Sequence, residues 1–161
     1  MYMITIRPIT TDDYEYVLNW SKDEKFCFAN GWEINRDEQE LYRWWVQCVN
    51  NDSKNFLRLG IELEQSLIGY ADLACIDGNT AELGIAIGDR SIWGKGNGFN
   101  ACVKMIDYAS SYLGITTFTA ETTESNIRAK KMLAKLGFDE VSRIGKEEYL
   151  GTDSQLIQYR L

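Results

Sequence analysis

Apolar and polar positions repeat with two different periods along this chain, and the two periods predict different elements. Alternation at every second residue is typical of a half-buried strand, whereas recurrence every three to four residues is typical of an amphipathic helix. The segments predicted as strands, from alternation or from a high content of β-branched residues, are residues 3–9, 55–63, 66–76, 81–88, 115–121, 138–144 and 154–161. The segments with helical spacing are residues 11–24, 36–50, 99–113 and 126–136. The pattern therefore predicts a sheet of about seven strands with four helices.

Capping signals mark the ends of the predicted helices. Side chains that can accept hydrogen bonds from free backbone N–H groups stand at three helix starts: Thr10 or Thr11, Asn35 with Glu38 in a capping box, and Ser125. Gly114 and Gly137 follow two of the helices, and glycine readily takes the left-handed conformation that ends a helix.

The order of the elements predicts an α+β fold. Three consecutive strands stand in the middle of the chain, and the Asp77-Gly78-Asn79 turn joins the last two, so we expect an antiparallel meander. The helix at 99–113 then makes a crossover to a parallel neighbour of the third meander strand. Nothing in the sequence divides residues 1–161, which are expected to form a single domain.

Composition and charge limit the classes of function. The chain is 45% hydrophobic and 25% charged, as in soluble globular proteins, and no apolar run is long enough to cross a bilayer. Its start lacks the pattern of a secretion signal, so a cytoplasmic location is expected, with a monomer or homodimer as the assembly. A net charge of -7 argues against nucleic acid and fits an amine-bearing partner better.

The absence of histidine limits the chemistry. Without it no histidine base or catalytic triad exists, so a general base must be a carboxylate, a tyrosine or a water molecule held by one. The four cysteines, Cys27, Cys48, Cys75 and Cys102, are widely spaced and form no CxxC pair. We therefore expect reduced thiols and no metal site.

A glycine-rich segment stands between the third meander strand and the crossover helix. Gly94, Gly96 and Gly98 surround Lys95 where the free N–H groups of a helix start are expected, a place that suits an anion such as a pyrophosphate. The spacing fits neither the P-loop, because no Ser or Thr follows Lys95, nor the dinucleotide fingerprint G-x-G-x-x-G.

Two motifs give the chain its resemblance to a known family. The segment Trp93-Gly94-Lys95-Gly96-Asn97-Gly98 resembles the coenzyme A loop Q/R-x-x-G-x-G/A, with Trp93 where the general pattern has Gln or Arg. Downstream, Asn126, Ala129, Met132 and Leu133 precede the run "KLGF", as in the second signature of the same family. On these residues the chain resembles the GNAT N-acetyltransferase superfamily and, within it, the RimJ/RimL-type branch.

The resemblance implies a sheet that splays between its fourth and fifth strands and binds acetyl-CoA as the acetyl donor, with no metal. It implies that the backbone of Ile85, Ala86 and Ile87 pairs with the pantetheine arm. Within the coenzyme loop from Trp93 to Gly98, it implies that the backbone from Lys95 to Gly98 holds the pyrophosphate. Asn126 is placed near the pantetheine arm, and Arg128 or Lys131 near the outer part of the coenzyme.

Two glutamates are candidates for the base that deprotonates an amine acceptor. Glu82 shares a strand face with the small residues Gly84 and Ala86, which leave room for a substrate. Glu121 ends the strand before Asn126 and matches the position of the base in some members of the superfamily. For each glutamate the alternative interpretation, with equal weight, is a strand-edge carboxylate that binds backbone or solvent and has no catalytic role.

The proton donor is not evident from the sequence. The family positions that carry a donor, a tyrosine or a serine, are here Leu133 and Ala129, so Tyr149 or Tyr108 would have to act from elsewhere. The acceptor site is expected in the connection between the first two helices, which contains Phe26, Phe28 and Trp32.

Two functional classes follow from these residues. The first is an N-acetyltransferase that acts on a protein N-terminus, a polyamine, an aminoglycoside or another small amine. The alternative is a catalytically impaired acetyl-CoA-binding or sensor protein on the same fold, which the missing proton donors allow.

Overall fold

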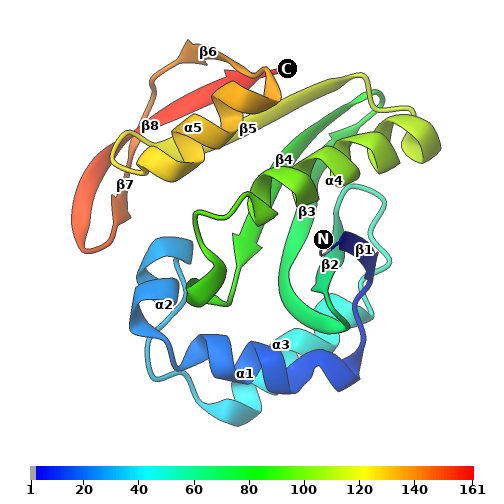
Figure 1. The fold of residues 1–161 in the computed structure, drawn as a ribbon, viewed down its shortest axis with the longest axis vertical. Helices are drawn as coiled ribbons and strands as arrows, with labels where there is room; N and C mark the ends of the chain where they lie inside the picture. Colours follow the sequence, from blue (N-terminus) through cyan, green and yellow to red (C-terminus); the bar gives the residue numbers. More distant parts are fainter. Residues whose placement is uncertain (1–2) are drawn as a thin grey trace.

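The computed structural model describes residues 3–161 and, within them, contains eight strands and five α-helices (Figure 1). The strands are β1 Ile4–Pro8, β2 Leu57–Leu63, β3 Ser66–Asp77, β4 Thr80–Ile87, β5 Thr117–Thr123, β6 Asp139–Ser142, β7 Lys146–Tyr149 and β8 Thr152–Arg160. The helices are α1 Tyr14–Ser21, α2 Glu24–Asn30, α3 Glu38–Val49, α4 Asn97–Leu113 and α5 Ile127–Leu136, with short 3-10 helices at Thr11–Asp13 and Arg90–Ile92. Residues 1 and 2, with which the predicted domain begins, lie outside the described residues.

The strands form one twisted sheet in the order β1-β2-β3-β4-β5-β8-β6, and β7 pairs with β8. Every pair of neighbours is antiparallel except β4 and β5, which are parallel. The predicted meander is confirmed as β2-β3-β4, and Gly78, with φ of +60°, turns the chain between the last two strands. The predicted α+β class and the crossover through α4 are likewise confirmed.

The structure has one more strand and one more helix than the sequence pattern predicts. The strand is β7, whose sequence KEEY is short and mostly charged, so it shows no apolar alternation. The helix is α2, which lies in the segment that the sequence pattern assigned to the connection between the first two predicted helices. Asp23 starts this second helix by accepting hydrogen bonds from the backbone N–H groups of Lys25 and Phe26.

Two of the predicted helix caps are wrong. Asn35 has a φ of +58°, and α3 starts two residues later with Asp37 as its N-cap. The N-cap of α5 is Asn126 rather than Ser125, because the Asn126 side chain accepts from the N–H of Ala129 at 3.2 Å. Thr10 stands at the N-cap of the 3-10 helix before α1, where its backbone N–H donates to Oδ2 of Asp13 at 2.8 Å, whereas the N-cap of α1 itself is Asp13. Gly114 and Gly137 end their helices in the left-handed conformation.

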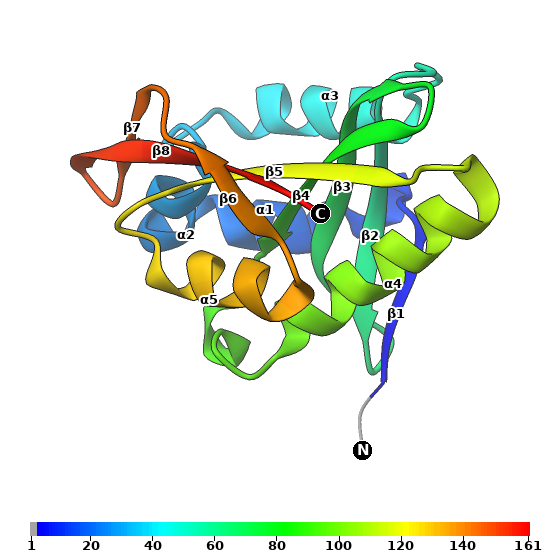
Figure 2. The same ribbon diagram turned by 90° about the horizontal axis from the view of Figure 1, so that it is seen from above.

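Helices cover both faces of the sheet (Figure 2). On one face α4 and α5 pack through Met105 and Leu133 against strand residues such as Leu73 and Ile157. On the other face α1, α2 and α3 enclose a second core around Phe26 and Trp45, both fully buried. Because strand side chains alternate between faces, the same strands supply both cores.

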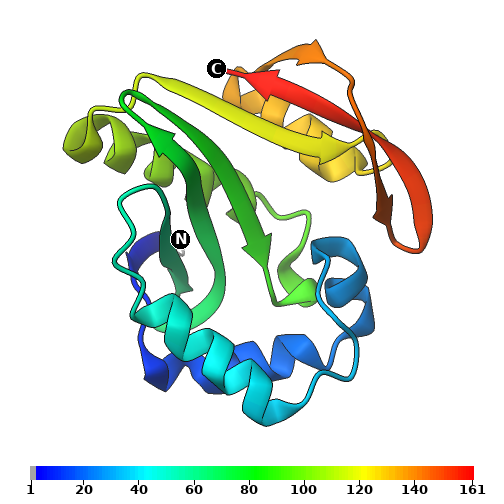
Figure 3. The same cartoon turned by 180° about the vertical axis from the view of Figure 1, so that it is seen from behind.

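The parallel pair β4-β5 is short. Thr80–Glu82 are in register with Thr117–Thr119, and beyond Glu82 the two strands diverge (Figure 3). β5 then pairs with β8 through Thr123, whereas β4 continues beside β3 up to Ile87. The second half of β4 therefore has, within the described residues, no strand partner on its β5 side, which confirms the predicted splay.

The close approach of β3 and β4 yields a stability prediction. A Cβ atom added at Gly69 would overlap the carbonyl oxygen of Ala86 in β4, whereas one added at Gly84 would have its nearest neighbour at 3.7 Å. We expect Gly69→Ala to lower the free energy of unfolding by about 2–4 kcal/mol, because backbone must move. Gly84→Ala, the matched control, should change it by less than about 1 kcal/mol. Urea denaturation measures both, and equal losses would contradict the close approach.

Candidate functional site

A cavity of about 510 Å³, called the groove below, brings together residues that are far apart in the sequence. One wall is the end of β4, the second is the loop between β4 and α4, and the third is α5. Of the residues predicted for coenzyme binding, the lining includes Ile85, Ala86, Ile87, Trp93, Gly94, Gly96, Asn97, Gly98 and Asn126. Lys95 is the exception, since it does not belong to the lining of the described structure.

The loop conformation depends on glycine at two positions. Gly94 and Gly96 have φ of +78° and +85°, in the region that side chains with a Cβ rarely occupy. Gly96 is also the N-cap of α4, so the N–H groups at the start of this helix face the groove with the positive end of the helix dipole. The loop can therefore bind an anion through its backbone.

Trp93 connects the walls of the groove instead of supplying a charge. Its indole Nε1 donates a hydrogen bond to the carbonyl oxygen of Ile87 at 2.7 Å, which fixes the loop to the end of β4. The guanidinium carbon of Arg128 lies 3.9 Å from the centre of the Trp93 ring, a cation–π contact that reaches across to α5. An indole thus occupies the position of the family's Gln or Arg, and it holds an arginine from another element.

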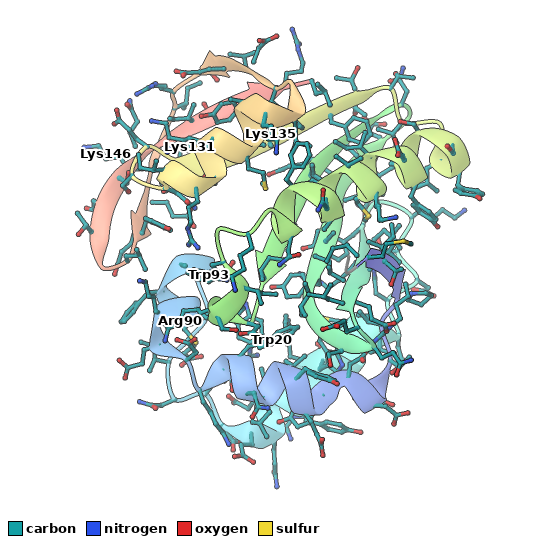
Figure 4. All side chains as sticks on the ribbon, in the orientation of Figure 1. Trp20, Arg90, Trp93, Lys131, Lys135 and Lys146 are labelled. Carbon is teal, nitrogen blue, oxygen red and sulfur yellow. The ribbon has the colours of Figure 1, made fainter. Side chains whose placement is uncertain are left out.

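The α5 wall is positively charged although the whole chain is acidic. Arg128, Lys131 and Lys135 line the groove, and the Lys135 ammonium lies 4.2 Å from the centre of the Phe99 ring. Figure 4 shows Lys131 and Lys135 on α5 and Trp93 on the loop after β4. Residues three and four apart share one face of a helix, so these three cations face the groove together.

Asn126 lies where the groove meets a second cavity. Its Oδ1 accepts the capping hydrogen bond of α5, so its Nδ2 is the atom left to donate to a ligand. The sequence motif therefore has a structural role at the helix start in addition to the binding role predicted for it.

The second cavity, called the gap below, occupies about 200 Å³ between the diverging parts of β4 and β5. Gly84 of β4, Glu121 and Thr123 of β5 and Glu147 and Glu148 of β7 are among its lining residues. It shares with the groove Ala29, Asn30, Ile85, Asn126, Ala129, Met132 and Tyr149. The two cavities are therefore continuous, with a cationic groove at one end and an acidic gap at the other.

The structure brings the two predicted glutamates together but places only one in the gap. Burial raises the pKa of Glu82 above its ordinary value, and the nearby charge of Glu121 raises it further. Glu121 lines the gap, and its Oε2 accepts a hydrogen bond from Nε2 of Gln158 at 2.8 Å. Glu82 is the last residue of β4 that pairs with β5, next to the point where these two strands diverge.

The hydroxyl of Thr123 is the one buried side-chain polar atom without a hydrogen-bond partner in the described part of the chain. Thr123 is 5% exposed and lines the gap. A buried hydroxyl without a partner is costly, and a polar ligand in the gap would satisfy it.

The aromatic residues of the α1–α3 connection do not line either cavity of the described structure. Phe26 is fully buried and packs against Trp32, with ring centres 4.9 Å apart, so both belong to the second core. Phe28, the third aromatic residue, is 42% exposed and lines neither the groove nor the gap. Ala29, Asn30 and Gly31 of the same connection line the gap, so the acceptor site in this connection stays a prediction. The sequence pattern did not predict that β7 lines the gap, because the segment KEEY shows no alternation of apolar and polar residues.

The two tyrosines named as alternative donors have different surroundings. Tyr149, at the end of β7, lines both the groove and the gap. Tyr108, on α4, packs beside Tyr112 with ring centres 5.2 Å apart and lines neither cavity in the described structure.

A fold with this split sheet, glycine loop and continuous cavity defines the acetyltransferase class, and the sequence comparison agrees. Residues 3–139 match the family described as "Acetyltransferase (GNAT) domain", and the chain belongs to this family. The RimJ/RimL-type branch remains a prediction.

Individual relatives are similar over most of this chain. It is 28% identical over 138 residues to alpha/beta-tubulin-N-acetyltransferase 9 of Homo sapiens, covering 76% of this chain and 65% of that protein. An uncharacterized protein of Methanocaldococcus jannaschii is 26% identical over 151 residues, which cover 91% of this chain. The chain spans only 30% of the length of that archaeal relative.

Solved structures share the fold. Spermidine N-acetyltransferase from Vibrio cholerae, in complex with CoA and spermine, superposes with a TM-score of 0.83 at 20% identity, covering 98% of this chain and 94% of that one. A GNAT-family acetyltransferase from Bacillus anthracis gives a TM-score of 0.81 at 16% identity, covering 100% and 98%.

Two features are absent from residues 3–161. These residues contain no cluster of three or more His, Cys, Asp or Glu side chains that could hold a metal ion. Their helices include none that is both long and apolar enough to cross a membrane.

Proposed function

We propose that this protein is an N-acetyltransferase that transfers the acetyl group of acetyl-CoA to a primary amine. The observation that carries the proposal is the continuity of the groove with the gap. A phosphate-binding loop opens directly onto an unpaired strand edge, and that edge leads to a small acidic cavity. A long anionic thioester and a cationic amine can therefore meet from opposite ends.

The groove fits the coenzyme on three counts. The N–H groups at the start of α4 and the cations of α5 suit its phosphates. The unpaired edge of Ile85, Ala86 and Ile87 offers backbone groups to the pantetheine amides, as a strand does to a neighbour. Nδ2 of Asn126 is available to a pantetheine carbonyl where the groove enters the gap.

The reaction is the direct attack of the amine on the thioester carbonyl. An ammonium ion must first lose a proton, and we propose Glu121 as the acceptor of that proton because it lines the gap. The amine nitrogen then forms a bond to the carbonyl carbon, and the carbon–sulfur bond breaks. Glu82, whose pKa is raised by burial and by Glu121, is the second candidate.

The acidic lining of the gap favours an acceptor that carries positive charge beyond the reacting amine. Glu121, Glu147 and Glu148 contribute three carboxylates, and the free hydroxyl of Thr123 adds a polar contact. The similar structure from Vibrio cholerae is named as a spermidine N-acetyltransferase, and the similar human protein as a tubulin N-acetyltransferase. We propose the class of cationic amines, which includes polyamines, aminoglycosides and basic N-terminal peptides.

One observation favours the alternative of a coenzyme-binding protein without turnover. The positions of α5 that carry a donor in the family are Ala129 and Leu133, and neither side chain can donate a proton. The two readings make different predictions for thiol release.

The test of the proposed function is release of free coenzyme thiol from acetyl-CoA over a panel of amines. We expect release that depends on the acceptor, with spermidine, an aminoglycoside and a basic peptide each faster than an amine that has no second charge. A peptide with a blocked N-terminus and no lysine is the matched control. Tight binding of acetyl-CoA with no acceptor-dependent release would establish the binding protein instead.

The loop geometry predicts an order for two substitutions. Gly96→Val should weaken acetyl-CoA binding far more than Lys95→Ala, by roughly tenfold or more, because φ of +85° is strained for valine. Lys95 lies outside the lining of the groove as described, so its loss should cost less than about threefold. Isothermal titration calorimetry measures both dissociation constants, and the reverse order would show that the lysine rather than the backbone binds the phosphates.

The direction in which the pH profile of the rate moves on substitution shows which of the two glutamates is the base. If Glu121 is the base, Glu121→Gln should lower the rate roughly 10²-fold and raise the pH at which the rate saturates. If Glu82 is the base, the same substitution removes a like charge, lowers the pKa of Glu82 and moves the acidic limb to lower pH.

We expect the result for Glu121 as the base, a lower rate that saturates at higher pH, and the pH dependence of kcat measures it. The second result would transfer the role to Glu82, and Glu82→Gln should then cause the rate loss. Glu140→Gln, which changes a carboxylate outside the lining of the described cavities, is the control for a general loss of negative charge.

A further inference from the structure

The junction of groove and gap, where the thioester carbon must lie, contains one titratable side chain. Of the described residues that line both cavities, Tyr149 alone has a side chain with a hydroxyl group. The polar neighbours at this junction, Asn30 and Asn126, carry amides, which do not titrate.

Helix α5 faces the same junction without a proton donor. Ala129 and Met132 line both cavities, and Leu133, which is 4% exposed, lines the gap. A donor to the leaving sulfur must therefore come from another wall, and β7 is the wall that carries Tyr149.

The hairpin β7-β8 holds Tyr149 in place. Tyr149 pairs with Thr152, and the two residues between them, Leu150 and Gly151, have φ of +52° and +82°, as in the tight turns that twist with a hairpin. The side chain is 9% exposed, and among residues 3–161 no hydrogen bond to its hydroxyl is present. The hairpin thus holds the backbone of Tyr149 at the wall of both cavities, and its hydroxyl is available to donate to a ligand there.

We propose that Tyr149 is the catalytic residue that protonates the coenzyme thiolate as it leaves, in place of a donor on α5. This inference rests on the proposed acetyl transfer. As the carbon–sulfur bond breaks, the phenol proton moves to sulfur and leaves a tyrosinate. The tyrosinate then takes the second proton of the acceptor nitrogen, which becomes the amide nitrogen. The first proton left through the base before attack, so the sum is amide, free thiol and one proton released.

The contribution of this donor is limited by the chemistry of sulfur. A thiol has a pKa near 8.5, far below that of an alcohol. A thiolate therefore leaves without help more readily than an alkoxide does. We therefore expect the lower end of the range for general acid catalysis, about 10²-fold. The donor must carry its proton to act, so a donor role predicts a fall in rate on the basic side of the pH profile.

The experiment compares Tyr149→Phe with Tyr108→Phe. Phenylalanine keeps the ring and its packing and removes only the hydroxyl. We expect Tyr149→Phe to lower kcat about 10²-fold and to lose the basic limb of the pH profile, with little change in the dissociation constant of CoA. Tyr108→Phe should leave kcat within about twofold, because it removes a hydroxyl outside both cavities of the described structure.

A second variant tests protonation itself. Incorporation of 3-fluorotyrosine at position 149 lowers the pKa of the phenol and keeps the hydroxyl, so the basic limb should move to lower pH. A residue that only packs would show no such shift. CoA binding by calorimetry and thermal unfolding of each variant confirm that the site is intact.

The outcomes separate this inference from the proposed function. If the wild-type protein transfers acetyl groups and both position-149 variants keep its rate and pH profile, Tyr149 is not the donor and the acetyl transfer stands. If the wild-type protein binds CoA but releases no thiol with any acceptor, the proposed function fails first, and the donor role fails with it.

Discussion

The short pairing of β4 with β5 is the constraint on which the site depends. Backbone N–H and C=O groups are satisfied by a neighbouring strand almost everywhere in a sheet, and here that pairing ends at Glu82. Beyond this point β5 turns to β8, and the free edge of β4 faces a cavity instead of a strand. A ligand with its own amide groups can supply the missing partner. The split also creates the gap in which two substrates can approach each other.

The packing around the split explains how the sheet keeps this opening. The two helical layers bury separate cores, so each face of the sheet is packed against its own helices. Trp93 adds a cross-connection, because its indole N–H binds the end of β4 while its ring receives Arg128 from α5. The groove thus has walls from three elements that are linked at one residue.

Charge is distributed unevenly along the continuous cavity. Cations of α5 line the groove, whereas the carboxylates of β5 and β7 line the gap, so the field changes sign across the junction. Such a field draws an anionic and a cationic substrate to opposite ends. Tyr149 and Asn126 stand where the two regions meet, with no formal charge on either.

The sequence by itself determined the framework and most of the groove. Alternation and turn signals predicted the meander, the glycines before the helix at 99–113 predicted the loop, and helical spacing predicted α5, although its cap is Asn126 and not Ser125. These are local signals, because a strand, a turn and a helix start are each specified within a few residues. The sequence pattern did not predict three features: the cap of α3, the separate helix α2 and the charged strand β7. Local preferences are weak at these places, and tertiary packing overrides them.

Only the tertiary structure decided which side chains meet. Arg128 could not be assigned to Trp93, nor Tyr149 to the junction, because each contact joins elements separated by many residues. For the same reason the sequence could not show that Ala29, Asn30 and Gly31, at the end of α2, line the gap while Phe26 is buried in the core. Sequence spacing specifies the face of an element, whereas the face it meets depends on how the whole sheet twists and where it parts.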